Sequence, residues 1–279
     1  MRKISIVVAA CLGLVAHGLN FEEFKGFASP ESVYVTDSYV YVSNVGKKLE
    51  PLAKDNDGFI SKLDRNGKVI EKEFLNGINA PKGMAIIGHT LYVVDIDVLR
   101  GFNLDNKKEV FNMPIKGAIF LNDIANLDNN TLFVSDTGTG VIHKVNLKNK
   151  TYSTFVKIDP KYAGPNGLLL DGNTLITVTY DPNGKIAGRV LKINLSNKKM
   201  SEFSKVSGAL DGVAFDKQGN LIVSSWGDNF KGKIYKIDKK AHAVELGLPA
   251  MFGPADIFYK DGYLWVPKMG ENAILKIKL

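Results

Sequence analysis

The sequence predicts an all-β fold, a six-bladed β-propeller with four strands in each blade. The first observation is a four-residue phrase that recurs six times at intervals of roughly 40–50 residues, a period typical of propellers and solenoids. The second is that each phrase opens a short apolar run, which further apolar runs follow between turn residues. The phrase occurs as Pro30-Glu31-Ser32-Val33, Pro81-Lys82-Gly83-Met84, Leu121-Asn122-Asp123-Ile124, Pro165-Asn166-Gly167-Leu168, Leu210-Asp211-Gly212-Val213 and Pro254-Ala255-Asp256-Ile257.

Each repeat contains strand signals beyond its phrase. In the third repeat the turn Asn129-Asn130 precedes the apolar run 132–134, and Gly140 precedes the run 141–145. A looser fourth run follows an Asn- or Lys-rich turn, as at 68–74 in the first repeat. Short β-branched and aromatic runs separated by Gly, Asn and Asp indicate strands joined by hairpins. Four such runs in each of six repeats predict the propeller.

Residues 1–18 differ from the repeats. Arg2 and Lys3 precede the apolar stretch 4–16, and Ala16-His17-Gly18 has the small-x-small pattern of a cleavage site. These features predict a secretory signal peptide and a periplasmic or secreted protein. The alternative is a lipobox that ends at Cys11 and leaves this residue lipidated. We expect the plain signal, because a lipoprotein signal of that length would be unusually short.

Residues 19–279 are predicted to form one propeller domain. The last repeat ends at Leu279 after only three runs, whereas residues 20–28 resemble the fourth run that precedes the second phrase. We therefore expect the N-terminal segment to supply the outer strand of the sixth blade. This closure would protect a sheet edge that could otherwise pair with another chain.

The longest insertion of any repeat lies between Asn44 and Gly58, on the same face as the phrases. It is polar and contains Pro51 and the turn Asp55-Asn56-Asp57. Loops on a rigid scaffold often carry function, so the insertion is a candidate lid. A tolerated surface loop without a function explains it equally well.

The composition excludes several function classes. The 279-residue chain has a formal net charge of +7, but no basic block interleaved with aromatic residues marks a nucleic-acid surface. Cys11 is the single cysteine, so a mature chain cut after Gly18 has no cysteine and depends on neither disulfides nor thiolate chemistry. The sequence contains no phosphate-binding Gly-rich motif, no Gly-x-Ser-x-Gly and no Cys/His zinc pattern. No segment is predicted to span a membrane, and we expect a monomer.

The second position of the phrase is the candidate functional position. It begins the innermost strand of each blade, so its six side chains should form a ring at one mouth of the central channel. Four of the six are oxygen donors, and Ca²⁺ prefers six to eight oxygen ligands in a loose geometry. Another divalent cation could take the same set. The ring consists of Glu31, Lys82, Asn122, Asn166, Asp211 and Ala255.

The order of these residues resembles the calcium-dependent six-bladed propeller hydrolases of the SMP/gluconolactonase family, which includes regucalcin. Diisopropyl fluorophosphatase, paraoxonase and NHL-repeat propellers are more distant likenesses. The resemblance covers residues 22–279 as architecture. It implies that one metal is bound by Glu31, Asn122, Asn166 and Asp211, with Asp211 as general base or nucleophile.

Several positions depart from the family pattern. Phe120 stands where the gluconolactonase branch usually has an Arg that contacts a sugar acid, which implies a less acidic, more apolar substrate. Lys82 is a cation within the ring. It could turn away from a metal, or it could pair with Glu31 or Asp211 and make the ring a polar plug without metal.

Other residues are expected near the ring. Asp123 and Asp256, one position further along the phrase, are expected to make outer hydrogen bonds around the metal ligands or to cap strands. Tyr180 and Trp226 follow second strands at matching places and could form an apolar wall. With Phe120 and Lys82 they are the predicted substrate-binding residues.

Two functions from different classes follow. The first is an exported, Ca²⁺-dependent hydrolase of a small ester or lactone, in which the metal polarises the carbonyl group. The second is a non-catalytic propeller that binds a ligand or protein at the phrase face. Propellers serve many functions, so the fold alone does not decide between them.

Overall fold

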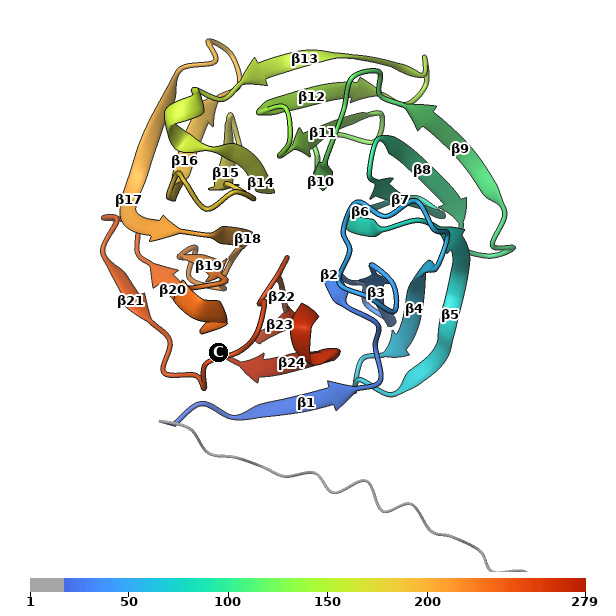
Figure 1. Cartoon of the computed structure of the whole chain (residues 1–279), viewed down its shortest axis with the longest axis horizontal. Coiled ribbons are helices and arrows are strands. Elements are labelled where there is room, and N and C mark those ends of the chain that lie inside the picture. Colours follow the sequence, from blue (N-terminus) through green and yellow to red (C-terminus); the bar gives the residue numbers. More distant parts are fainter. Residues whose placement is uncertain (1–17) are drawn as a thin grey trace, which may run out of the picture.

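Twenty-four β-strands form six four-stranded antiparallel sheets in the computed structural model, which describes residues 18–279. Figure 1 shows the sheets as blades around a central channel, which confirms the predicted six-bladed propeller. The predicted signal peptide, apart from Gly18, and the alternative lipidation site at Cys11 lie outside the described residues.

The first three blades follow the chain from the inside outward. Blade 1 consists of β2 (Pro30–Val35), β3 (Tyr39–Asn44), β4 (Gly58–Asp64) and β5 (Val69–Ile78). Blade 2 consists of β6 (Pro81–Ile87), β7 (Thr90–Asp95), β8 (Val98–Asn103) and β9 (Glu109–Pro114). Blade 3 consists of β10 (Leu121–Asn126), β11 (Thr131–Asp136), β12 (Val141–Asn146) and β13 (Thr151–Lys157).

The remaining blades repeat this order, except for the outer strand of the last one. Blade 4 consists of β14 (Gly164–Asp171), β15 (Thr174–Tyr180), β16 (Gly188–Asn194) and β17 (Met200–Gly208). Blade 5 consists of β18 (Leu210–Phe215), β19 (Leu221–Ser225), β20 (Lys233–Ile237) and β21 (Ala243–Glu245). Blade 6 consists of β22 (Phe258–Lys260), β23 (Tyr263–Lys268), β24 (Ala273–Lys278) and β1 (Phe21–Lys25).

Helices in the described part are three single turns in the connections, and none of them could cross a membrane. They are η1 (Pro160–Tyr162), η2 (Asp228–Phe230) and η3 (Met269–Glu271).

The N-terminal strand closes the ring, as predicted. β1 pairs antiparallel with β24, with Phe21 opposite Ile277 and Lys25 opposite Ala273. The ring of Phe24 stacks on Trp265 of β23 at a centroid distance of 6.1 Å. The blue first strand and the red last strands therefore share one sheet (Figure 1).

The core lies between neighbouring blades. One cluster joins Tyr41 and Ile60 of blade 1 to Leu91 and Phe102 of blade 2, and similar clusters fill the other interfaces. Alternate residues of each strand point to opposite faces of its sheet, so every blade contributes apolar side chains to both of its neighbours.

The sequence suggested that each phrase begins a regular strand, but the strand pairing at the phrases is irregular. In blades 1 to 5 the pairing of the inner strand with the second strand shifts register within the phrase. In blade 6 the phrase lies before β22, and the N–H of Asp256 donates to the carbonyl oxygen of Glu31 in blade 1 (2.9 Å). Such bulges redirect side chains, and here they accompany second positions that line the channel mouth.

Neighbouring inner strands approach closely at the third position of the phrase. A Cβ atom on Gly167 would lie 2.5 Å from the carbonyl oxygen of Asp211, and one on Gly212 would lie 2.5 Å from the amide nitrogen of Ile257. These contacts are with backbone atoms, which cannot rotate away. Glycine at these positions therefore allows the inner strands to form a narrow waist in the channel.

Candidate functional site

A cavity of about 440 Å³ opens where the inner strands begin. Five of the six ring residues line it, and so do the three predicted wall residues Phe120, Tyr180 and Trp226. The sixth ring residue, Ala255, is buried in an apolar cluster with Ala80 and Met269. The ring residues in the cavity are Glu31, Lys82, Asn122, Asn166 and Asp211.

Four buried oxygen atoms in this cavity have no hydrogen-bond partner among the described residues. They are Glu31 Oε2, Asn122 Oδ1, Asn166 Oδ1 and Asp211 Oδ1. Each of these side chains is at most 6% exposed, so water does not freely satisfy them. Unpaired buried acceptors cost free energy unless a cation or an ordered water binds there.

These four atoms belong to the predicted metal ligands, and their chemistry fits a hard divalent cation. Two carboxylates would balance the 2+ charge, and two carboxamide oxygens would extend the shell without excess negative charge. Residues 18–279 contain no group of three or more His, Cys, Asp or Glu side chains suited to a metal. The candidate set differs from such groups because half of its ligands are amides.

Serine side chains of the second strands position the ring. The N–H of Asp123 donates to Ser135 Oγ (2.9 Å), and this hydroxyl donates to the carbonyl oxygen of Asn166 in the next blade (2.7 Å). Ser224 repeats the arrangement between Gly212 and Ala255. Each hydroxyl replaces a strand hydrogen bond that the bulge removes and fixes the neighbouring ring residue.

Asp211 has one fixed and one unpartnered oxygen. Its Oδ2 accepts a hydrogen bond from Trp226 Nε1 (2.7 Å), whereas its Oδ1 is one of the four unpartnered atoms. Trp226 in turn meets Phe252 edge-on at 6.1 Å. The hydrogen bond from the indole therefore fixes one carboxylate oxygen of Asp211 and leaves the other available.

Burial makes the acids of the channel hard to ionise. The pKa of Glu31 is raised well above its usual range, first by burial and then by the charges of Asp211 and Asp256. Burial also raises the pKa of Asp211 to about 7, although the hydrogen bond from Trp226 acts in the opposite direction. Buried carboxylates close to each other ionise together only when a positive charge compensates them.

Lys82 does not provide that charge through an ion pair. Its ammonium group donates to the carbonyl oxygens of Pro51 (2.7 Å) and Ala80 (2.9 Å), and among the described residues no ion pair joins it to Glu31 or Asp211. Its Nζ lies 5.1 Å from the ring centroid of Phe120. Burial lowers the pKa of Lys82 to about 8, although the charge of Glu31 acts in the opposite direction. Two backbone carbonyl groups therefore hold the ammonium group of Lys82.

The insertion between β3 and β4 covers one side of the cavity. Leu49, Pro51 and Leu52 line it, so the half of the insertion that contacts the site is apolar rather than polar. Lys54 Nζ forms an ion pair with Asp97 Oδ2 of blade 2 (2.6 Å), which attaches the loop to the next blade. The insertion is thus a wall of the candidate site.

Acids at the ends of the second strands act on the backbone outside the cavity. Asp95 accepts from the N–H groups of Asn79 and Ala80, and Asp136 accepts from those of Ile119 and Phe120. Asp181 accepts from backbone N–H groups of its own loop. The three described histidines lie elsewhere, and none of them lines the cavity: His89, His143 and His242.

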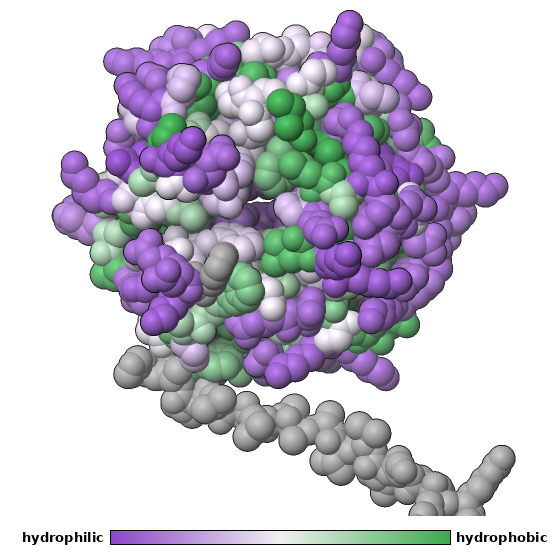
Figure 2. All heavy atoms as spheres, in the orientation of Figure 1, coloured by the Kyte–Doolittle hydropathy of each residue, from purple (hydrophilic) through white to green (hydrophobic). Residues whose placement is uncertain are grey.

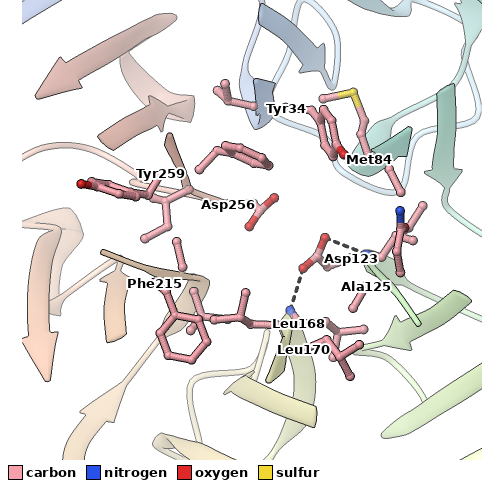
Figure 3. A pocket seen from close by; sticks show the side chains of 18 residues that line it. Tyr34, Met84, Asp123, Ala125, Leu168, Leu170, Phe215, Asp256 and Tyr259 are labelled. Atoms are coloured by element: carbon pink, nitrogen blue, oxygen red, sulfur yellow. Dashed lines mark hydrogen bonds between the residues drawn. The ribbon is translucent and has the colours of Figure 1, made fainter. Parts of the chain in front are cut away.

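Asp123 and Asp256 face the opposite mouth of the channel. They line a second cavity, of about 390 Å³, with the later residues of the inner strands. Figure 3 shows the two carboxylates on facing sides of this cavity, with Asp123 bonded to the N–H groups of Ile124 and Leu168 (both 2.6 Å). Asp256 Oδ2 accepts from Ser32 Oγ of blade 1 (2.5 Å). Both acids therefore connect adjacent blades below the ring.

Sequence reasoning missed part of the wall of the site. Leu49 and Leu52 could have been found as apolar residues within the predicted insertion, and Ile119 as the neighbour of Phe120. Met269 gave no signal, because it reaches the cavity from the short helix η3.

The chain resembles several solved proteins in its fold. No model of a known protein family matches the chain, and no curated protein matches it significantly. Among solved structures, a gluconolactonase from Xanthomonas campestris is similar with a TM-score of 0.72 and 12% identity, over 95% of this chain and 91% of the other. A putative gluconolactonase is similar with a TM-score of 0.71 and 14% identity, over 96% and 94%.

A third solved structure is virginiamycin B lyase from Staphylococcus aureus, with a TM-score of 0.63 and 14% identity, over 94% of this chain and 99% of the other. At these identities the likeness shows the fold. The resemblance expected from the ring residues is consistent with these structures, and the chain has the six-bladed propeller architecture of the gluconolactonases.

Proposed function

We propose that this protein is a hydrolase of lactones or other carboxylic esters that depends on one divalent cation, Ca²⁺ above all. The observation that carries the proposal is that four residues from four different blades line one cavity and each has a buried oxygen without a hydrogen-bond partner. The solved gluconolactonases with the same fold support lactone hydrolysis as the reaction class. The predicted signal peptide supports an exported protein.

Glu31, Asn122, Asn166 and Asp211 would hold the cation. When bound, the cation would polarise the carbonyl group of the ester and stabilise the negative charge that develops on its oxygen. Open positions beside the four side chains would admit the substrate. Burial raises the pKa values of Glu31 and Asp211 in the absence of a cation. The positive charge of a bound cation would favour their ionised forms and so offset this effect of burial.

Asp211 would move the proton. A water molecule attacks the carbonyl carbon while its proton passes to Asp211 Oδ1, and the same proton returns to the leaving alkoxide as the acyl–oxygen bond breaks. Trp226 keeps Asp211 Oδ2 engaged, so the proton is exchanged at a single oxygen. In the alternative, Asp211 Oδ1 attacks the carbonyl carbon, the acyl–oxygen bond of the ester breaks, and the alkoxide leaves as an alcohol with a proton from water. The resulting hydroxide hydrolyses the mixed anhydride, which releases the acid and regenerates Asp211.

Calorimetry and a hydrolysis screen test the proposal. EDTA-treated protein is titrated with CaCl₂, and lactones and aryl esters are then assayed with and without Ca²⁺. We expect one binding event per chain and turnover only with the cation. Binding without turnover on any ester would contradict hydrolysis and leave a structural cation site.

A non-catalytic binding propeller is the second candidate function. The exposed apolar residues beside the cavity, such as Leu52 and Ile119, favour it. The absence of both calcium binding and turnover in the same experiment would select this candidate.

A further inference from the structure

The mouth of the site cavity has an exposed apolar rim. Leu49 and Leu52 of the insertion are 37% and 46% exposed, and Ile119, which precedes β10, is 55% exposed. All three line the cavity. Figure 2, seen from the same side as Figure 1, shows hydrophobic side chains gathered beside the central hollow. Single exposed apolar residues need no explanation, but a group around a concave site indicates a binding surface.

The apolar surface continues from the rim into the cavity. Phe120, Pro182, Trp226 and Met269 line the wall below it. Phe120 and Met269 are buried, and Trp226 is held in place through its bond to Asp211. A ligand that reaches the unpartnered oxygens therefore passes along apolar side chains.

The cavity offers little to a charged or polyhydroxylated ligand. Lys82 is the one basic side chain among the described residues that line it, and its ammonium group is occupied by the carbonyl oxygens of Pro51 and Ala80. An anionic substrate would meet Glu31 and Asp211 without a basic partner. Apart from the four proposed cation ligands, Lys82 and Trp226, Tyr180 has the remaining polar side chain among the described residues that line the cavity. Unmatched polar groups are costly to bury.

We propose that the substrate is a neutral ester or lactone with an alkyl chain, and that this chain binds between Leu49, Leu52 and Ile119. The proposal rests on the proposed function and adds to it the substrate class and the residues that select it. The ester group lies at the ring, and the chain extends toward the solvent along the rim. The insertion thus determines specificity.

A series of γ-lactones with alkyl chains of increasing length tests this inference, with glucono-δ-lactone as the polar comparison. At saturating Ca²⁺ we expect kcat/KM to rise about two- to fourfold per methylene, as expected for buried CH₂ groups, until the chain passes the rim. Glucono-δ-lactone should be the poorer substrate. Equal rates for all chain lengths, or a preference for glucono-δ-lactone, would overturn the inference while leaving the hydrolase intact.

Three variants of the rim residues test where the alkyl chain of the substrate binds. Leu49→Asp, Leu52→Asp and Ile119→Asp should each reduce the dependence of kcat/KM on the length of the alkyl chain at least threefold, measured within each variant relative to its own kcat/KM for the unsubstituted γ-lactone. Ile70→Asp is the matched control, since Ile70 is 53% exposed on β5 and does not line the cavity. A chain-length dependence that survives in all three rim variants would refute the assignment of these residues.

Binding of γ-lactams with the same alkyl chains separates this inference from the proposed function, because lactams are neutral and resist hydrolysis. Affinity that rises with chain length and falls in the rim variants would support the ligand class even if no ester were turned over. A lactam affinity that depends neither on the length of the alkyl chain nor on the rim residues would contradict the inference, whatever the result of the hydrolysis screen.

Discussion

The ring side chains that we propose as cation ligands divide into charged and neutral groups. Glu31 and Asp211 bring the negative charge, whereas Asn122 and Asn166 bring dipoles, and a divalent cation is attracted chiefly by charge. We therefore expect Asp211→Asn and Glu31→Gln to weaken Ca²⁺ binding about tenfold or more, and more than Asn166→Ala does. Calorimetric titration measures the affinity of each variant.

A charge-matched control accompanies these variants. Glu50→Gln removes an exposed carboxylate from the insertion without touching the ring, and it should leave the affinity unchanged. If Asn166→Ala were the most damaging substitution, the carboxylates would not be the principal ligands.

Lys82 is expected to influence both the ring and the insertion. Its charge acts on Glu31, while its ammonium group holds the Pro51 carbonyl of the insertion. Lys82→Met keeps most of the apolar volume but removes the charge and both hydrogen bonds. Ca²⁺ affinity should therefore increase, and limited proteolysis within residues 45–57 should become faster. An unchanged affinity together with unchanged proteolysis would show that Lys82 influences neither the ring nor the insertion.

The ring residues were predictable because they share one position in a repeated phrase. The orientation of Lys82 was not, because it depends on Pro51 in an irregular loop that no periodicity describes. Met269 was missed for a similar reason, because it lies in the connection between β23 and β24. Periodicity predicts what a repeat imposes on each blade, whereas the walls of the site come from the connections in which the blades differ.

β1 is the strand that closes the ring of blades. It supplies the outer strand of blade 6, and Phe24 covers Trp265. Deletion of residues 19–28 should expose the edge of β24, lower the thermal midpoint and promote aggregation. Differential scanning calorimetry and light scattering measure both effects.

Two controls define what β1 contributes. A chain that begins at residue 18 keeps β1 and should behave as the full chain does. Phe24→Ala keeps the strand pairing but removes the aromatic contact, so it should give a smaller decrease in stability than the deletion. A deletion protein as stable and soluble as the full chain would show that the strand is dispensable.

Strand positions followed from the apolar runs, but the bulges did not. In blades 3 and 5 the register shift is accompanied by the hydroxyl groups of Ser135 and Ser224, each of which contacts two blades at once. A sequence pattern records local alternation, and these hydrogen bonds join residues that are distant in the chain. Blade 6 deviates furthest, since Asp256 bonds to Glu31 of blade 1 rather than within its own sheet.

For the whole molecule, the buried acids link stability to pH. Burial raises the pKa values of Asp211 and Asp256 from 3.8 to about 7, so the folded protein binds these protons more tightly than the unfolded chain does. Their stabilising contribution is present at low pH and is lost as the pH rises through 7. Without calcium, the free energy of unfolding should therefore fall between pH 5 and pH 8.

Urea unfolding of EDTA-treated protein at several pH values measures this effect. Asp256→Asn should reduce the pH dependence, while Asp136, whose pKa is lowered, changes stability only below this pH range. Ca²⁺ at 100 times the dissociation constant that it has at pH 8 should add about 2.7 kcal/mol at that pH. The same concentration should add less at pH 5, where protons compete with the cation for the acids. Metal-free protein that becomes more stable from pH 5 to pH 8 would contradict the burial of these acids.

The pairing of β1 with β24 also fixes an order of events during synthesis. The closing sheet joins the first strand to be made with the last, so the ring cannot close until translation of the final strand is complete. Contacts between such distant residues slow folding. The same pairing brings the two ends of the domain together, so a short linker between them and a new opening in another hairpin would leave every strand pairing intact.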